Sequence, residues 1–462
     1  MNTISLAGML TRARLSSRTG STVLDALSVI AFAVASWLTM TTAGGVWMFH
    51  ARQNTVTKIY WDSFGMDFGG EVYFGLALVA VGLLTIPLLT LGAGAARLGA
   101  GARERRLASL RLIGMSTGQV VVLSILESII QALIGFGVGL VIYLATLPAW
   151  GALSFTTLPI QASEMLLPWW GILAAYLLVT LIAMTSTIIG LRRVSISPLG
   201  VAKRIIPLQV RIWRILVLVA AIALILYQTA HFKPGQEMLA SIVSLGVAIL
   251  IFVGAVTIVG PLFLQITMRP LVATSSPARL IAIRRVVSNA RGAWRNISAI
   301  VLMGLVATIA SSLMKVSFNP NADQTVNGLS FYQLLGGDIS KGVMVAFAFS
   351  LIIGATGTLI QQVSDVYDRA EEARSLIYVG TPVRTLIRAR FIQVLLPLMV
   401  STLFVVILGF LPATAQPALV NWQNMYVLLA MVMAGIALTF AALLVTVPIQ
   451  RNIVSARVRR ND

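Results

Sequence analysis

Few residues in this 462-residue chain have the type and spacing that chemistry requires. Glu127 lies inside a long apolar run, with Ser124 and Gln131 on nearly the same helical face. An acid at such depth in a membrane is costly and often functional, but a polar side chain there also serves as a hydrogen bond between helices. We interpret Glu127 first as a packing contact, and a polar latch that changes partners is the competing hypothesis.

The sequence argues against most other chemistry. It has no cysteine, which rules out disulfides, thiol catalysis and cysteine-based metal sites. The two histidines, His50 and His231, are far apart, so we predict no metal site. No GxxxxGK[ST] phosphate-binding loop occurs, so the chain is not predicted to hydrolyse ATP or to hold a cofactor of its own. We find no catalytic residues.

The composition indicates the elements that position these residues. Apolar residues make up 58% of the chain and charged residues only 11%, against about a quarter in soluble domains. The net charge of +19 falls in short basic clusters between apolar runs, which is typical of membrane topology and not of nucleic-acid binding. The sequence therefore predicts an all-α polytopic membrane protein. Ten runs are long enough to span, at 23–49, 72–97, 119–147, 168–191, 214–230, 238–267, 297–317, 342–363, 391–411 and 425–448.

The basic residues also predict the orientation. With both termini in the cytoplasm, only Arg52, Lys58, Lys233, Lys315 and Lys341 of the 34 Lys and Arg residues lie outside. The first apolar run is too long for a signal peptide. Residues 6–18 before it could form a basic amphipathic helix at the inner interface. We predict a multi-pass protein of a bacterial plasma membrane.

The outer loops are short, at 50–71, 148–167, 231–237, 318–341 and 412–424, and leave no room for a folded domain of usual size. Aromatic residues such as Trp47, Tyr73 and Trp170 gather at the outer helix ends. We interpret them as an interfacial belt, with an aromatic substrate site as the alternative.

Two inner loops resemble each other at an offset of 266 residues. Residues 103–114 read RERRLASLRLIG and residues 369–380 read RAEEARSLIYVG. Their apolar residues recur at helical spacing, which predicts a short surface helix ended by glycine in each loop. At the same offset, Gln393 is the counterpart of Glu127. We therefore predict a first four-helix repeat over 1–205, a two-helix insert over 206–275 and a second repeat over 276–462.

A smaller pattern concerns helix packing. Gly135 and Gly139 have the small-xxx-small spacing that lets two helices approach closely.

Both four-helix halves resemble the FtsX/MacB-like permeases of ABC transporters, the type VII class, and the first half carries the more specific motifs. The resemblance rests on residues 103–116, on Gln119 and Glu127-Ser128, and on the basic stretch LRRVSISPLGVAK at 191–203. The order of four, two and four helices is similar to the bacitracin-resistance permeases, but their large external domain is missing between helices seven and eight. The large periplasmic domain of the tripartite macrolide exporters is missing as well.

The resemblance implies that each short surface helix couples to a separate ATPase subunit, of which two copies, holding the ATP and Mg²⁺, would bind one permease. The implied coupling residues are Arg103, Glu104, Arg105, Arg106, Leu107, Leu110, Arg111, Gly114, Glu371, Glu372, Arg374, Leu376 and Gly380. The implied activity is export of an amphipathic or lipophilic compound, such as an antimicrobial peptide, an antibiotic or a lipid. Mechanotransmission to an extracytoplasmic partner is the alternative, and a secondary transporter ranks third.

Overall fold

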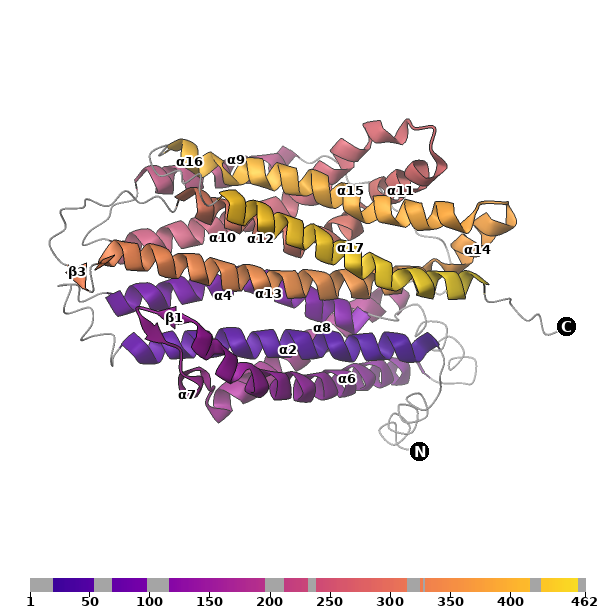
Figure 1. Ribbon diagram of the computed structural model, residues 1–462. Coiled ribbons are helices and arrows are strands. Elements are labelled where there is room, and N and C mark those ends of the chain that lie inside the picture. The colour runs from indigo at the N-terminus through magenta and orange to yellow at the C-terminus, as the bar shows by residue number, and fades with distance from the viewer. Residues whose placement is uncertain are drawn as a thin grey trace.

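The computed structural model describes residues 20–53, 69–97, 116–195, 212–231, 238–313, 325–326, 329–415 and 425–455. Within these ranges, ten helices are long and apolar enough to cross a membrane, and they run along one common direction (Figure 1). This confirms the prediction of an all-α polytopic membrane protein. The two small sheets are two-stranded hairpins at the end of the bundle opposite α14.

The first half of the chain forms four long helices. They are α2 (Gly20–Gln53), α4 (Gly69–Arg97), α6 (Thr117–Thr146) and α8 (Trp169–Ser195). The connection from α6 to α8 folds into a small cap of a 3₁₀ turn, η1 (Leu147–Ala152), the hairpin β1 (Ser154–Phe155) and β2 (Leu158–Pro159), and a short helix α7 (Ala162–Met165).

The rest of the chain begins with α9 (Ile212–Ala230) and α10 (Met238–Met268). The 3₁₀ turn η2 (Pro270–Val272) then leads to α11 (Pro277–Ser288), which was not predicted, and to α12 (Ala290–Leu313). The hairpin β3 (Thr325–Val326) and β4 (Leu329–Ser330) precedes α13 (Phe331–Asp368) and α14 (Ala370–Tyr378). The chain continues through α15 (Val383–Gly409), α16 (Leu411–Ala415) and α17 (Met425–Ser455).

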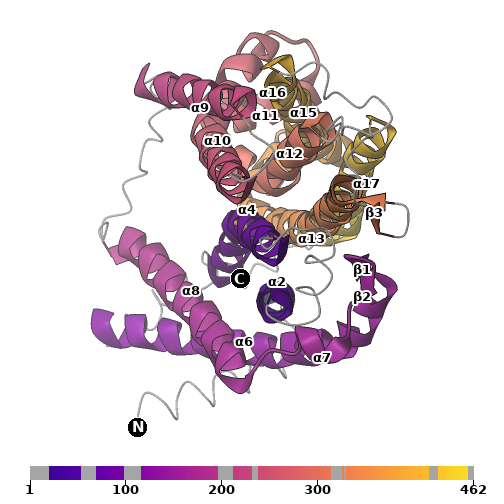
Figure 2. The same cartoon turned by 90° about the vertical axis from the view of Figure 1, so that its left-hand side faces the viewer.

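The long helices have the same neighbours in both halves. In the first half α2 packs on α4 and α6, and α8 packs on α4 and α6; in the second half α12 packs on α13 and α15, and α17 packs on α13 and α15. Figure 2 shows α4 and α13 in the middle, where they contact each other. The helix α10 packs on α4 and α12. The division into two repeats with an insert remains a prediction that this pattern supports.

Large apolar side chains are exposed along the outside of the bundle. Leu181 of α8, Leu216 of α9 and Leu403 of α15 are typical. A water-soluble protein rarely exposes contiguous apolar surface on this scale, and lipid is the solvent in which such a surface is stable.

The glycines at the predicted spacing allow α6 to pack closely on α2. A Cβ at Gly135 would lie 2.9 Å from the carbonyl oxygen of Val29, and one at Gly139 would lie 2.6 Å from that of Ala33. Only glycine allows this approach of two backbones. The prediction made from the sequence is confirmed.

Three of the predicted helix starts are wrong by more than a turn, and one of them is that of α12, which begins at Ala290 and not at 297. The outer loop predicted over 318–341 ends earlier, because α13 begins at Phe331 and contains Asp338 and Lys341. These charges are tolerated inside the helix because they pair with each other. Likewise α15 begins at Val383, eight residues before the apolar run, because the helix continues past the apolar segment with arginines on it.

Candidate functional site

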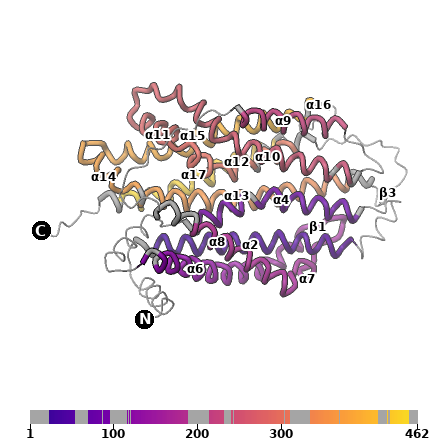
Figure 3. Tube along the Cα trace, turned by 180° about the vertical axis from the view of Figure 1, so that it is seen from behind, coloured from indigo at the N-terminus to yellow at the C-terminus, as the bar shows by residue number. Residues whose placement is uncertain are grey.

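The short helix α14 occupies one end of the bundle, close to the last residues of α17 and beside α11 (Figures 1 and 3). Glu371 and Glu372 lie in its first turn, where negative charge favours the helix dipole. Ser375 and the two glutamates are exposed, while Leu376 and Ile377 are half-buried. The predicted surface helix over 371–380 is therefore confirmed as a helix.

The end of α14 is set by glycine, as predicted. Gly380 has a φ of +97°, in the left-handed region that favours glycine. Its N–H donates to the carbonyl of Ile377, and the N–H of Thr381 donates to the carbonyl of Leu376. These two bonds form a Schellman motif, which satisfies the last carbonyl groups of the helix and turns the chain sharply into α15.

The turn leaves two large side chains at the tip of α14. Tyr378 is 84% exposed and Val379 is 85% exposed. Both residues lie between two candidate membrane spans, Leu334–Tyr367 and Val383–Gly409. Two adjacent apolar side chains at the tip of a helix in water form a small hydrophobic anchor of the kind found at protein interfaces.

Three ion pairs join α14 to the bundle, and we call them the α14 joint. Arg285 of α11 donates to Glu372 at 2.9 Å. Arg369, between α13 and α14, donates to Asp365 at 2.7 Å and to Glu372 at 3.4 Å. Glu372 thus links α14 to two neighbours at once. A shift of α14 must either carry α11 and the end of α13 with it or break these contacts.

The carboxylates of the α14 joint stabilise the positive charge of Arg369. Burial alone would lower the pKa of Arg369, but the nearby carboxylates of Asp365 and Glu372 outweigh it and raise the pKa above the usual value. Arg369 therefore stays protonated at any physiological pH.

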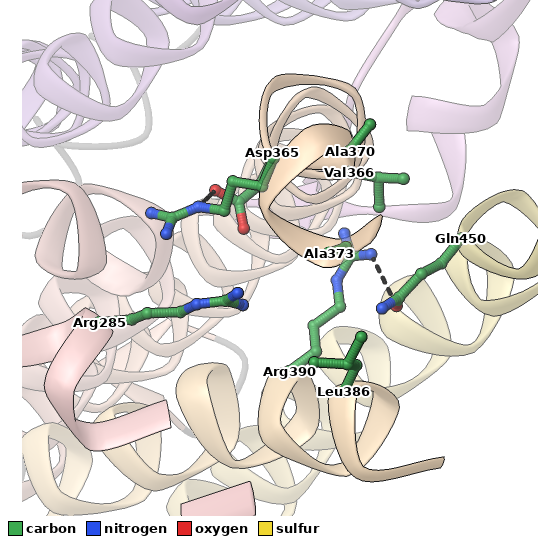
Figure 4. Close-up of a pocket in the computed structure, with 9 residues that line it drawn as sticks. Arg285, Asp365, Val366, Ala370, Ala373, Leu386, Arg390 and Gln450 are labelled. Atoms are coloured by element: carbon green, nitrogen blue, oxygen red, sulfur yellow. Dashed lines mark hydrogen bonds and ion pairs between the residues drawn. The ribbon is translucent and has the colours of Figure 1, made fainter. Parts of the chain in front are cut away.

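Next to the joint, Arg390 of α15 ties three helices together. It is 5% exposed and donates to the side chain of Gln362 on α13 at 2.9 Å, to the backbone carbonyl of Gln362, and to Gln450 on α17 at 3.3 Å. Figure 4 shows the guanidinium groups of Arg285 and Arg390 pointing into one space below Asp365. The fork geometry of arginine suits such a set of acceptors.

Part of the predicted coupling site lies outside the described residues. The segment 103–114, with Arg103, Glu104, Arg105, Arg106, Leu107, Leu110, Arg111 and Gly114, belongs to this part, and so does the predicted interfacial helix over 6–18. Of the second segment, Glu372 enters the α14 joint, while Glu371 is exposed and Arg374 is half-buried.

The predicted intramembrane polar residues lie in two separate places. Glu127 is buried in α6, and its neighbour Ser128 accepts a hydrogen bond from Thr187 of α8 at 2.8 Å. Gln131 donates to Asp25 of α2 at 3.0 Å. These bonds join neighbours of Glu127 to other helices, and the packing interpretation of Glu127 itself stays a prediction. Gln393 lies instead in the second half, beside a cavity lined by Arg285 and Asp365.

A second polar cluster lies at the opposite end of the bundle, and we call it the outer clasp because this end is the outer one in the orientation predicted from the sequence. Asp338 of α13 is 4% exposed and accepts hydrogen bonds from Tyr73 of α4 at 2.8 Å and from the backbone N–H of Thr156 at 2.7 Å. Lys341 pairs with Asp338 at 2.9 Å and donates to the carbonyl of Ser154 at 2.7 Å. One carboxylate thus holds the hairpin and α4 of the first half against α13 of the second.

The cap itself is anchored to α2. Arg52 donates to Glu164 of α7 at 2.5 Å and to the carbonyl of Pro159 at 2.9 Å. The cap, α2 and α13 are therefore connected at the end of the bundle opposite α14.

Sequence reasoning did not single out Asp338, Arg285 or Arg390. Asp338 and Lys341 have i, i+3 spacing, and Asp365 and Arg369 have i, i+4 spacing. These spacings are a signal for pairs within a helix. Contacts between residues far apart, such as Arg285 with Glu372, leave no trace in a single sequence.

The fold and these two clusters define a multi-pass membrane protein whose second half has an ionically tethered surface helix. Residues 79–199 match the family of the FtsX-like permease C-terminal region. This confirms the resemblance read from the sequence, and the ten apolar helices are consistent with a permease of the type VII class of ABC transporters. Members of this family are typically non-catalytic membrane subunits that partner with ATPase subunits. A search of the curated proteins found no match.

Proposed function

We propose that this chain is the permease subunit of an ABC transporter, and that two copies of a separate ATPase subunit bind at the end of the bundle that carries α14. The observation that carries the proposal is the exposed pair Tyr378 and Val379 at the tip of a helix that ion pairs tether to the bundle. The tip offers an apolar anchor to a partner, and the α14 joint offers a path for motion. The segment 103–114 would hold the second copy.

The joint suggests how ATPase motion would reach the membrane. Only Arg369 separates α13 from α14, and Arg369 pairs with both of them. Movement of α14 would displace α13, which contacts α2 and α4 of the first half. Closing of two ATPases would then shift the two halves against each other. In this proposal ATP and Mg²⁺ are held by the ATPase alone, and this chain performs no hydrolysis.

We further propose that the cargo is an amphipathic or lipophilic compound, such as an antimicrobial peptide, an antibiotic or a lipid, expelled toward the outer side. The small cap and the lipid-facing apolar flanks support a cargo that enters from the membrane. This choice rests on the family resemblance more than on any site in the bundle.

One observation favours a second candidate. The outer clasp joins the cap to α13, the same helix that carries the α14 joint. Mechanotransmission would use this connection to signal to an extracytoplasmic partner without moving a substrate.

The first test is affinity purification of the chain from its native membranes in mild detergent, followed by mass spectrometry and native mass. We expect a P-loop ATPase at two copies per permease. Tyr378→Ser should weaken ATPase binding by about tenfold or more, because interface anchors are worth about 2 kcal/mol or more.

The matched control is Tyr426→Ser, since Tyr426 is 77% exposed in the first turn of α17, whereas α14 lies close to the last residues of that helix. It should bind the ATPase as the unchanged chain does. A permease that purifies alone, or equal binding by both variants, would contradict the proposal. ATPase binding without ATP-driven movement of any tested cargo would favour mechanotransmission.

A further inference from the structure

A polar hollow lies at the α14 end of the second half, in the corner between α11, α12, α13 and α15. Its volume is about 460 Å³ including its open mouth. The polar residues around it are Arg285, Asn289, Arg295, Asn296, Gln361, Asp365, Arg369 and Gln393.

Positive charge exceeds negative charge around the hollow. Arg285 and Arg369 line both this hollow and an adjoining one, where Arg390 joins them. Among the described residues, the carboxylates in printed ion pairs with these guanidinium groups are Asp365 and Glu372. Arg295 adds a fourth guanidinium on the wall of the hollow. Several guanidinium groups around one hollow favour the binding of an anion.

Hydrogen-bonding groups in the hollow also lack partners among the described residues. The Nε of Arg285 is buried without an acceptor, although the other end of that guanidinium pairs with Glu372. The side-chain oxygens of Asn296 and Gln393 are buried without donors. Because the oxygen and nitrogen of an amide are assigned from their surroundings, both amides can turn their NH₂ groups toward an anion.

The depth of the hollow indicates where the anion comes from. Asp365 is in the last turn of the span Leu334–Tyr367, and Arg295 is in the second turn of the span Ala290–Ile309. The hollow therefore lies where two candidate spans end, which is the level of the lipid head groups for a helix that crosses a membrane. Basic pockets between membrane helices on the cytoplasmic side are typical sites for anionic head groups.

We propose that the hollow binds a phosphate group, supplied by an anionic phospholipid, with Arg285 as its main ligand and the amides of Asn296 and Gln393 as further donors. Guanidinium groups bind phosphate oxygens in a forked, charge-assisted geometry. The phosphate would connect α11, α12 and α15. Because Arg285 also holds Glu372, the bound lipid and α14 share one ligand, and lipid occupancy would alter the tether of α14.

The test uses the full chain purified in mild detergent and stripped of lipid. Phosphatidylglycerol, phosphatidylcholine with the same acyl chains, or inorganic phosphate is then added, and bound molecules are counted by native mass spectrometry. We expect phosphatidylglycerol to bind and phosphatidylcholine not to bind. Arg285→Gln should weaken phosphatidylglycerol binding by about tenfold, the usual effect of losing a charged hydrogen bond.

Two further variants test whether the loss of lipid binding is specific to Arg285. Arg284→Gln removes an exposed arginine of the same helix and should leave binding unchanged. Glu372→Gln breaks the same ion pair as Arg285→Gln but leaves the phosphate ligand in place, so its binding should be equal or tighter. If Arg284→Gln and Arg285→Gln weaken phosphatidylglycerol binding equally, or if Arg285→Gln does not weaken it, the proposed site is overturned. Binding of inorganic phosphate without phosphatidylglycerol would overturn the lipid as the source.

Discussion

Asp338 illustrates how a single carboxylate connects distant segments of this protein. Its donors come from α4, from the hairpin turn and from its own helix. The turn is unusual, because Thr156 and Thr157 have φ of 55° and 64° although neither is glycine. Such a conformation costs about 1–2 kcal/mol per residue and persists when surrounding contacts fix it. The bond from the N–H of Thr156 to Asp338 is one such contact.

We therefore expect Asp338→Ala to destabilise the protein by about 2–3 kcal/mol, because it leaves Tyr73, Thr156 and Lys341 without their buried acceptor. Thermal unfolding in detergent, followed by intrinsic fluorescence, measures the effect as a lower Tm. Glu71→Ala is the control, since Glu71 is an exposed carboxylate in the first turn of α4. An equal Tm for both variants would show that the outer clasp contributes nothing.

At the scale of elements, the contact of α6 with α2 depends on which glycine faces the partner. Gly139 lies against the backbone of α2, whereas a Cβ at Gly137 would meet no atom within 4 Å. We expect Gly139→Ala to force the two helices apart and to lower the Tm. Gly137→Ala should be neutral or slightly stabilising, because alanine favours the helix. A Tm unchanged by Gly139→Ala would contradict close packing here.

The helix α14 depends on glycine for a different reason. A Cβ at Gly380 would meet nothing within 4 Å, so the cost of Gly380→Ala is conformational only, about 1 kcal/mol. We expect this variant to fold normally but to loosen the end of α14 and weaken ATPase binding severalfold in the co-purification assay. Gly337→Ala, at an equally open position inside α13, should bind as the unchanged chain does. Normal binding by Gly380→Ala would mean that the Schellman motif has no part in docking.

The elements also show what a single sequence can predict. Apolar runs located the ten spans, because burial in lipid determines where a long helix lies. The glycine stop of α14 was predicted from one residue, since few other residues adopt its φ. The hairpin at 154–159 was missed, because its turn is Thr-Thr and not a usual turn pair. The α14 joint was missed, because Arg285 and Glu372 are 87 residues apart.

At the scale of the whole molecule, the two halves meet through α4 and α13 and are clasped at one end by Asp338. If ATP turnover moves the halves, the outer clasp must open. Because the chain has no cysteine, this can be tested with engineered pairs. Ser154 and Lys341 suit the purpose, since they are hydrogen-bonded across the clasp at 2.7 Å.

We expect a bifunctional maleimide that links Ser154→Cys to Lys341→Cys to stop ATP turnover by the complex of permease and ATPase in nanodiscs. The control is Ser154→Cys with Pro159→Cys, which are cross-strand partners within the hairpin. The same reagent then links two residues of the first half and leaves the two halves unconnected. Continued turnover by the linked Ser154–Lys341 pair would show that the clasp stays closed throughout the cycle.

The length of α13 has a thermodynamic consequence. Asp338 and Asp365 lie on one uninterrupted helix, about 40 Å apart at 1.5 Å per residue. If a shift of α13 changes the binding surfaces at both of its ends, then ligand binding at the outer clasp and ATPase binding near α14 are linked equilibria. Their coupling is reciprocal. A compound that binds the outer end more tightly when the ATPase is bound must, by the same factor, tighten the hold of the permease on its ATPase.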